Sequence, residues 1–211
     1  MLLMMGDYVV SYKNMVHENG GQNESMRVYR LAIQIAEQEN ADMLIVQLAA
    51  LLHDVDDVKL SLETHETKKN AVRFMKNSGV DDKVIASVCK IIDEVSFAGI
   101  DSVVPSTIEG KCVQDADRLD AMGAIGIART FAYGGSKGRR IHDPDIKLMT
   151  KMNKADYHQK HNSTSINHFN EKLLLLKDMI NTESAKKMAE HRQAVMEEYL
   201  VEFLAEWEGE K

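Results

Sequence analysis

The chain has 211 residues, of which 44% are hydrophobic and 28% charged, a balance that suits one sizeable core or a pair of small, closely packed units. The formal net charge of −7 argues against a protein that coats nucleic acid or an anionic membrane, because such surfaces carry an excess of Lys and Arg. Cys89 and Cys112 are the only cysteines and lack a CxxC spacing, which excludes a disulfide framework and a thiolate zinc site and indicates a reducing, cytoplasmic compartment.

The composition favours helix, since the sequence holds only 2 prolines and many Leu, Ala, Met, Glu and Lys residues. The apolar residues 1–5 have neither a basic leader nor a small-residue cleavage site after them, so no secretory signal is expected. No apolar run reaches the ~20 residues needed to span a bilayer. We therefore expect an all-α protein.

Apolar residues at helical spacing predict an amphipathic helix over residues 24–39. The next predicted helix, residues 41–54, is apolar around most of its circumference and should be the central, buried one. A shorter helix over residues 66–77 ends before Gly79, a residue type that is common just after a helix end.

Asp81 is expected to cap a further helix. Ser106 and Glu109 have the Ser-x-x-Glu form of a capping box and should open the helix that carries residues 114–120. The stretch from Gly134 to about Ser165 shows no periodicity, and its glycines, proline and many charges predict a long loop.

The rest of the chain predicts two more helices, over residues 166–180 and 183–207. Their predicted inward positions are Phe169, Leu173, Leu176 and Ile180 in the first, and Met188, Val195, Tyr199 and Phe203 in the second.

His53 and Asp54 form the first chemical motif, at the end of the most apolar helix. Burying an unpaired carboxylate there would cost several kcal/mol, so a cation is expected nearby. Asp56 and Asp57 add negative charge at a helix C-terminus, where the helix dipole disfavours it. The alternative is structural: His53 is a satisfied core histidine, and the aspartates cap the following turn.

A second acidic motif, residues 115–120, lies in another mainly apolar helix. It raises the same burial problem as the first motif. Taken alone, this motif could also be a salt-bridged helix face.

Several segments, in this order along the chain, carry a family resemblance: Arg27-Val28, residues 49–55 around His53-Asp54, residues 109–111, 113–121 and 123–135, Asn167-His168-Phe169 and Glu171-Lys172-Leu173. Over about residues 24–210 the chain resembles the HD-domain superfamily of metal-dependent phosphohydrolases, and within it a bacterial subgroup of small HD hydrolases. The resemblance implies an all-α helical bundle. Residues 1–125 would be its metal-binding core, and residues 126–211 a C-terminal helical extension with a substrate loop, packed on the core.

The resemblance also implies that His53, Asp54 and Asp117 bind a divalent metal ion, because they stand in the motif positions. The family's first ligand, a histidine three residues before the arginine of the first segment, is replaced by Glu24. Glu24 could substitute as an oxygen ligand, His17 could take that position, or the site could be weakened to that of a poor enzyme or a binding relic. An oxygen-rich ligand set favours Mn²⁺ or Mg²⁺, with Fe²⁺, Co²⁺, Ni²⁺ and Zn²⁺ as the other candidates.

Such an ion would acidify a water molecule and polarise a phosphoryl oxygen. Asp57 matches the position where related enzymes keep an acidic residue that orients or deprotonates the water, although it could equally be a solvated helix-end carboxylate. Lys59, Arg118 and Arg27 adjoin the ligand motifs and could bind phosphate or neutralise buried carboxylates. Further along, a basic group could form the edge of a polyanion pocket: Lys137, Arg139, Arg140, His168 and Lys172.

These observations favour a metal-dependent phosphohydrolase that acts on a small phosphorylated substrate, in particular a nucleotide such as a nucleoside triphosphate. No polymeric nucleic acid or membrane partner is expected, and a homo-oligomer is compatible with the sequence. The second hypothesis is a catalytically weakened nucleotide- or metabolite-binding protein of the same fold, because of Glu24. The third is an interaction module that uses Tyr199, Phe203 and Trp207 of the last helix.

Overall fold

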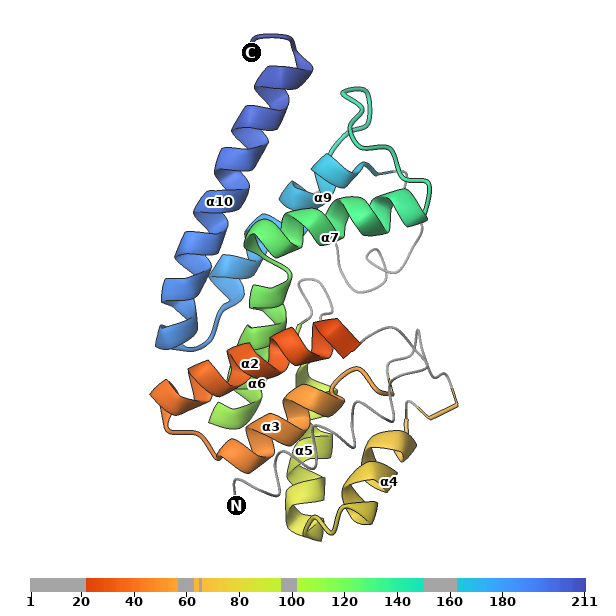
Figure 1. The fold of residues 1–211 in the computed structure, drawn as a ribbon, viewed down its shortest axis with the longest axis vertical. Helices are drawn as coiled ribbons and strands as arrows, with labels where there is room; N and C mark the ends of the chain where they lie inside the picture. The colour runs from red at the N-terminus through yellow and green to blue at the C-terminus, as the bar shows by residue number, and fades with distance from the viewer. Residues whose placement is uncertain (1–21, 57–62, 65, 96–101, 150–162) are drawn as a thin grey trace. The chain divides into compact units, whose positions relative to one another are not determined.

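The computed structural model describes residues 22–56, 63–64, 66–95, 102–149 and 163–211 (Figure 1). These residues form helices and no strand, which confirms the all-α prediction. None of the helices in these ranges is both long and apolar enough to cross a membrane.

The described residues divide into two compact units. The first contains α2 (Gln22–Glu39), α3 (Met43–Leu52), α4 (Lys69–Asn77), α5 (Asp82–Val95) and α6 (Ile108–Asp120) as far as Ala116. The second contains residues 102–103 and the chain from Asp117 onward, with α7 (Gly123–Ser136), α9 (Ser165–Glu171), the 3-10 helix η2 (Leu173–Met179) and α10 (Glu183–Trp207). The boundary between the units therefore falls inside α6, whereas the predicted core and extension, residues 1–125 and 126–211, remain a prediction.

In the first unit α3 is the buried central helix, as its sequence predicts. It packs against α2 and α5, and α4 packs against α5. The Asp42 carboxylate caps α3, because its Oδ1 accepts hydrogen bonds from Leu44 N at 2.9 Å and Ile45 N at 3.3 Å. Val46 and the five residues from Leu48 to Leu52 are fully buried. The helix α3 therefore holds His53, which follows it directly, on a rigid support.

The helix α4 begins at Lys69, later than the predicted start at residue 66. Lys68 has φ 49° and ψ 39°, a left-handed backbone that a helix cannot continue through. At the other end Gly79 has φ 71°, which confirms its position just after the helix.

The predicted capping box of α6 is wrong. The Ser106 hydroxyl donates to Glu94 Oε1 at 3.0 Å, and Glu109 Oε1 accepts from Asp42 N at 3.1 Å. Thr107 caps the helix instead, since its Oγ1 accepts from Gly110 N at 3.1 Å. Ser106 and Glu109 thus each bind a residue that is distant in the sequence instead of each other.

In the second unit α7 packs against α9 and α10, and η2 packs against the same two helices. The loop predicted from Gly134 is wrong at its start, because Gly134 and Gly135 lie in the last turn of α7. A Cβ at Gly134 would lie 2.3 Å from Ser165 Oγ, so this glycine permits the close approach of α7 to α9.

The predicted helix over residues 166–180 is broken at Lys172, whose φ −141° and ψ −59° separate α9 from η2. The inward positions of this segment are nevertheless confirmed as buried: Phe169, Leu173, Leu176 and Ile180. In α10 the fully or nearly fully buried positions include Met196 and Leu200, one residue beyond the predicted Val195 and Tyr199, which are half-buried.

Candidate functional site

The side chains of His53 and Asp54 lie together at the C-terminal end of α3. His53 Nε2 is 3.1 Å from Asp54 Oδ2, and the two side chains are 4% and 44% exposed. On the other side of the ring, His53 Nδ1 lies 2.9 Å from Ala50 O. Because a carbonyl oxygen only accepts, Nδ1 carries a hydrogen, and Nε2 is the ring nitrogen that faces the carboxylate.

This arrangement fits a cation. Two acceptor atoms at 3.1 Å repel each other unless a proton or a metal ion lies between or beside them. Histidines that bind metals usually donate their second ring N–H to a carbonyl or carboxylate, which fixes the ring orientation, as Nδ1 does here with Ala50 O. The donor set therefore suits a divalent ion that accepts both nitrogen and oxygen ligands.

Glu24 and Arg27 lie near the start of α2, with half-buried side chains, and α2 packs against α3. Throughout the described ranges, no three His, Cys, Asp or Glu side chains are arranged so that they could hold a metal ion. The predicted ligand set of His53, Asp54 and Asp117, and Glu24 as a further oxygen ligand, thus remain predictions.

Asp56 has a structural role. Its carboxylate is buried and caps the N-terminus of α4, with Oδ2 accepting from Ala71 N at 2.9 Å and Oδ1 from the Asn70 side chain at 2.9 Å. The structural alternative, in which the aspartates cap the following segment, is thus confirmed for Asp56. Asp57, Lys59 and His17 lie outside the described residues.

The acidic motif of α6 is divided between the two units. Asp115, in the first unit, is fully buried, whereas Asp117, at the start of the second, is half-buried. Asp120 is buried and pairs with Arg129, whose Nη1 lies 2.5 Å from Asp120 Oδ2. The salt-bridged reading of the motif therefore holds for Asp120.

Two arginines of this region donate hydrogen bonds to backbone carbonyl groups. Arg118 is buried and donates to Met179 O of η2, and Arg192 of α10 donates to Leu119 O at 2.5 Å. Sequence reasoning missed Arg129 and Arg192, although Arg129 stands in the matched segment 123–135. Their roles become visible only in the contacts of the folded chain: Arg129 pairs with Asp120, and Arg192 donates to Leu119 O.

Several members of the predicted basic group of the second unit have partners nearby. Arg140 pairs with Asp143 three residues later, and Lys137 Nζ and Arg139 Cζ lie 5.7 and 5.9 Å from the centre of the Tyr133 ring. Burial, and then the charges of Lys172 and Arg139, lower the pKa of His168 from 6.5 to about 3. His168 is consequently neutral near pH 7.

The described cysteines do not offer a thiolate ligand near neutral pH. Burial raises the pKa of Cys89, and burial with the nearby Asp115 raises that of Cys112 to about 12.

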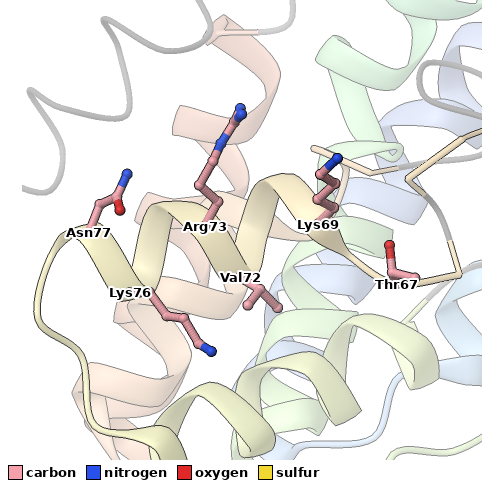
Figure 2. Close-up of a pocket in the computed structure, with 6 residues that line it drawn as sticks. All are labelled: Thr67, Lys69, Val72, Arg73, Lys76 and Asn77. Atoms are coloured by element: carbon pink, nitrogen blue, oxygen red, sulfur yellow. The ribbon is translucent and has the colours of Figure 1, made fainter.

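A shallow hollow of about 530 Å³ lies on α4, and none of the predicted site residues lines it. Figure 2 shows that Lys69 and Arg73 extend from the same side of the helix, while Val72 and Lys76 point to the other side. The opposite, inner face of α4 buries Ala71, Phe74 and Met75. The hollow therefore follows the polar face of an amphipathic helix and lies apart from the His53–Asp54 chemistry.

Known proteins resemble this chain over most of its length. The HD-domain family model matches residues 23–122. The protein YpgQ of Bacillus subtilis is 39% identical over 180 residues, which cover 82% of this chain and 78% of YpgQ.

Two solved structures agree with this result. An HD-superfamily hydrolase from Bacillus thuringiensis is 38% identical, with a TM-score of 0.77 and coverage of 97% of this chain and 96% of that one. YpgQ in complex with ADP is 34% identical, with a TM-score of 0.74 and coverage of 94% and 96%. These relatives indicate a hydrolase-type enzyme at the level of the family, and HD domains generally depend on a divalent metal ion. Given the match of its residues 23–122 and its similarity to YpgQ, the chain belongs to the HD-domain family.

Proposed function

We propose that the chain is a metal-dependent phosphohydrolase that cleaves a phosphoester or pyrophosphate bond of a nucleotide, including nucleoside triphosphates. The observation that carries the proposal is the pair formed by His53 Nε2 and Asp54 Oδ2 at 3.1 Å, with the imidazole oriented by Ala50 O. The ADP bound by the related YpgQ supports a nucleotide as the substrate class. A small phosphorylated molecule in the cytoplasm, rather than a nucleic acid or a membrane, is the proposed partner.

Under this proposal His53, Asp54 and Asp117 hold the metal ion, with Glu24 as a further oxygen ligand. When bound, the ion supplies a Lewis acid that polarises a phosphoryl oxygen and acidifies water. His53 presents Nε2 because its Nδ1–H is held by Ala50 O, and the buried surroundings of the ring exclude bulk water from that side. A ligand set with one imidazole and three carboxylates favours Mn²⁺ or Mg²⁺.

The reacting groups around the ion are assigned by their sequence positions. Asp57 orients or deprotonates the attacking water, and Lys59 and Arg27 offset the negative charge of the phosphoryl oxygens. Arg118 is a weaker candidate for substrate binding, since its guanidinium donates to Met179 O.

A catalytically weakened nucleotide-binding protein is the second candidate. It is favoured by Glu24, a carboxylate in the position of the family's first histidine ligand. Such a protein would bind nucleotides without cleaving them.

The test combines metal analysis with a hydrolysis screen. The purified full chain would be assayed for bound divalent ions by mass spectrometry and, with added Mn²⁺, for release of phosphate or pyrophosphate from a nucleotide panel. We expect bound metal and Mn²⁺-stimulated release, and we expect Asp54→Asn to lower the rate by about 100-fold or more. Asp178→Asn, the same change at an exposed position of η2, is the matched control.

The outcomes separate the two candidates. Nucleotide binding without metal and without Mn²⁺-stimulated release would support the binding protein. Hydrolysis that survives Asp54→Asn at the rate of the control would remove His53 and Asp54 from the mechanism.

A further inference from the structure

The outer face of α4 carries positive charge. In a chain whose formal net charge is −7, residues 67–80 contain Lys and Arg but no Asp or Glu. Lys68 is buried and its Nζ lies 2.6 Å from Asp93 Oδ1, so its charge is compensated. The remaining cations line the shallow hollow around Val72 (Figure 2): Lys69, Arg73 and Lys76.

These three side chains are exposed and have no acidic partner within the ranges that the structure describes. Arg73 Nη2 donates to Asn70 Oδ1 at 3.2 Å, which is a neutral acceptor of the same helix. Positions i, i+4 and i+7 share one face of a helix and here extend over about 10 Å of its length. Lys69, Arg73 and Lys76, with the half-buried Val72 among them, are called the basic face of α4 below.

The outer face of α10 carries the opposite charge. Residues 193–210 contain glutamates but no Asp, Lys, Arg or His. Glu197 and Glu198 are exposed one turn before Val201, whose side chain is 67% exposed, and neither pairs with a cation in the described part of the chain. The opposite side of the helix is buried, for example at Met196. Glu197, Glu198 and Val201 are called the acidic face of α10 below.

We propose that the chain associates with itself head to tail, with the basic face of α4 in one copy lying along the acidic face of α10 in a second copy. The cations of α4 pair with Glu197 and Glu198, and Val72 meets Val201 between them. The charges are complementary, and both faces combine exposed charges with an apolar side chain at helical spacing. Because the chain as a whole is acidic, a second copy suits the basic face better than a nucleic acid does.

The size of this contact makes the association weak. The helix α4 has 9 residues and is therefore about 14 Å long, so a single helix pair buries less than the roughly 1,200 Å² of a stable interface. Ion pairs between exposed groups are also screened by salt. Each copy uses two different surfaces, so further copies can add to either end.

The experiment measures the self-association of the full chain by sedimentation equilibrium in EDTA, so that no divalent ion bridges two copies. At low salt we expect the molar mass to rise with chain concentration. In about 1 M NaCl, where the screening length is about 3 Å, the association constant should fall by about tenfold or more. A wild-type chain that stays monomeric up to about 1 mM at low salt would overturn the proposal.

A charge exchange identifies the two faces. Arg73→Glu and Glu198→Lys each place like charges opposite one another and should each weaken self-association by about tenfold. An equimolar mixture of the two variants should associate again, since the basic face of one variant can meet the unchanged acidic face of the other, and the two altered faces are also complementary. Urea denaturation of both variants checks that the chain remains folded.

The matched controls are Arg30→Glu and Glu37→Lys, the same charge changes at exposed positions of α2. Both should associate like the wild type. Wild-type association in Arg73→Glu or Glu198→Lys, an equal loss in the controls, or a mixture that stays dissociated would contradict a contact between α4 and α10. None of these measurements depends on hydrolysis, so the result is separate from the proposed function.

Discussion

The guanidinium of Arg129 lies 2.5 Å from the carboxylate of Asp120, a side chain that is only 2% exposed. Arg129→Gln would remove this cation from the buried carboxylate, on which the charge of Arg192 also acts. We expect the free energy of unfolding, measured by urea denaturation, to fall by about 2 kcal/mol, because the arginine is partly exposed and water can compensate in part.

The double variant Asp120→Asn with Arg129→Gln tests this reason. Removing both charges should recover part of the loss, since no isolated carboxylate is left behind. Purely additive losses would contradict a direct interaction between the two side chains.

Asp56 is expected to stabilise α4 through its capping hydrogen bonds. Asp56→Ala should lower the free energy of unfolding by about 1–2 kcal/mol, since it removes the acceptor for Ala71 N and the Asn70 side chain. Asp56→Asn, which keeps one acceptor oxygen, should lose less. Equal losses in the two variants, measured by urea denaturation, would contradict the capping role.

Glu24→His restores an imidazole at the position of the family's first ligand. We expect about tenfold higher affinity for Co²⁺ or Ni²⁺, measured by calorimetry, and a higher hydrolytic rate, because these ions prefer nitrogen donors. Glu37→His, the same change at an exposed position of α2, is the control and should alter neither. Unchanged affinity and rate in Glu24→His would place residue 24 outside the coordination sphere.

His168 should make the stability depend on pH. Its folded-state pKa of about 3 lies below the usual 6.5, so below pH 6.5 the unfolded chain takes up a proton that the folded chain does not. This contribution to stability is complete above pH 6.5 and falls by at most about 1.4 kcal/mol per pH unit below it.

Urea denaturation at pH 7.5 and 5.5 measures this effect. The stability of His168→Gln should fall less between the two pH values than that of the wild type. His191→Gln, at an exposed position of α10, should behave like the wild type. The same pH dependence in all three proteins would rule out a depressed pKa for His168.

The aromatic residues at the end of α10 pack within their own unit. The ring of Trp207 lies 5.0 Å from that of His142 and 5.9 Å from that of Phe203, and Phe203 lies 6.4 Å from Phe131. Because the Trp207 ring is half exposed, we expect Trp207→Ala to cost about 1–2 kcal/mol of stability and to leave the molar mass from light scattering unchanged. A lower molar mass would instead support the interaction module.

The sequence by itself determined the helical class, most of the helices and the His53–Asp54 motif. These depend on local information: apolar spacing, a central helix with apolar residues on most sides, and two neighbouring residues that also occur in a recognisable family pattern. The left-handed glycine after α4 and the buried positions of the segment from α9 to η2 follow from the same local rules.

Only the tertiary structure decided which partner each polar group has. Asp56 caps a helix that starts 13 residues later, Thr107 rather than Ser106 caps α6, and Arg129 pairs with Asp120. Such contacts join residues far apart in the chain, so neither spacing nor composition encodes them. Periodicity predicts which face of a helix is buried, whereas the fold determines which oxygen or nitrogen atom that face meets.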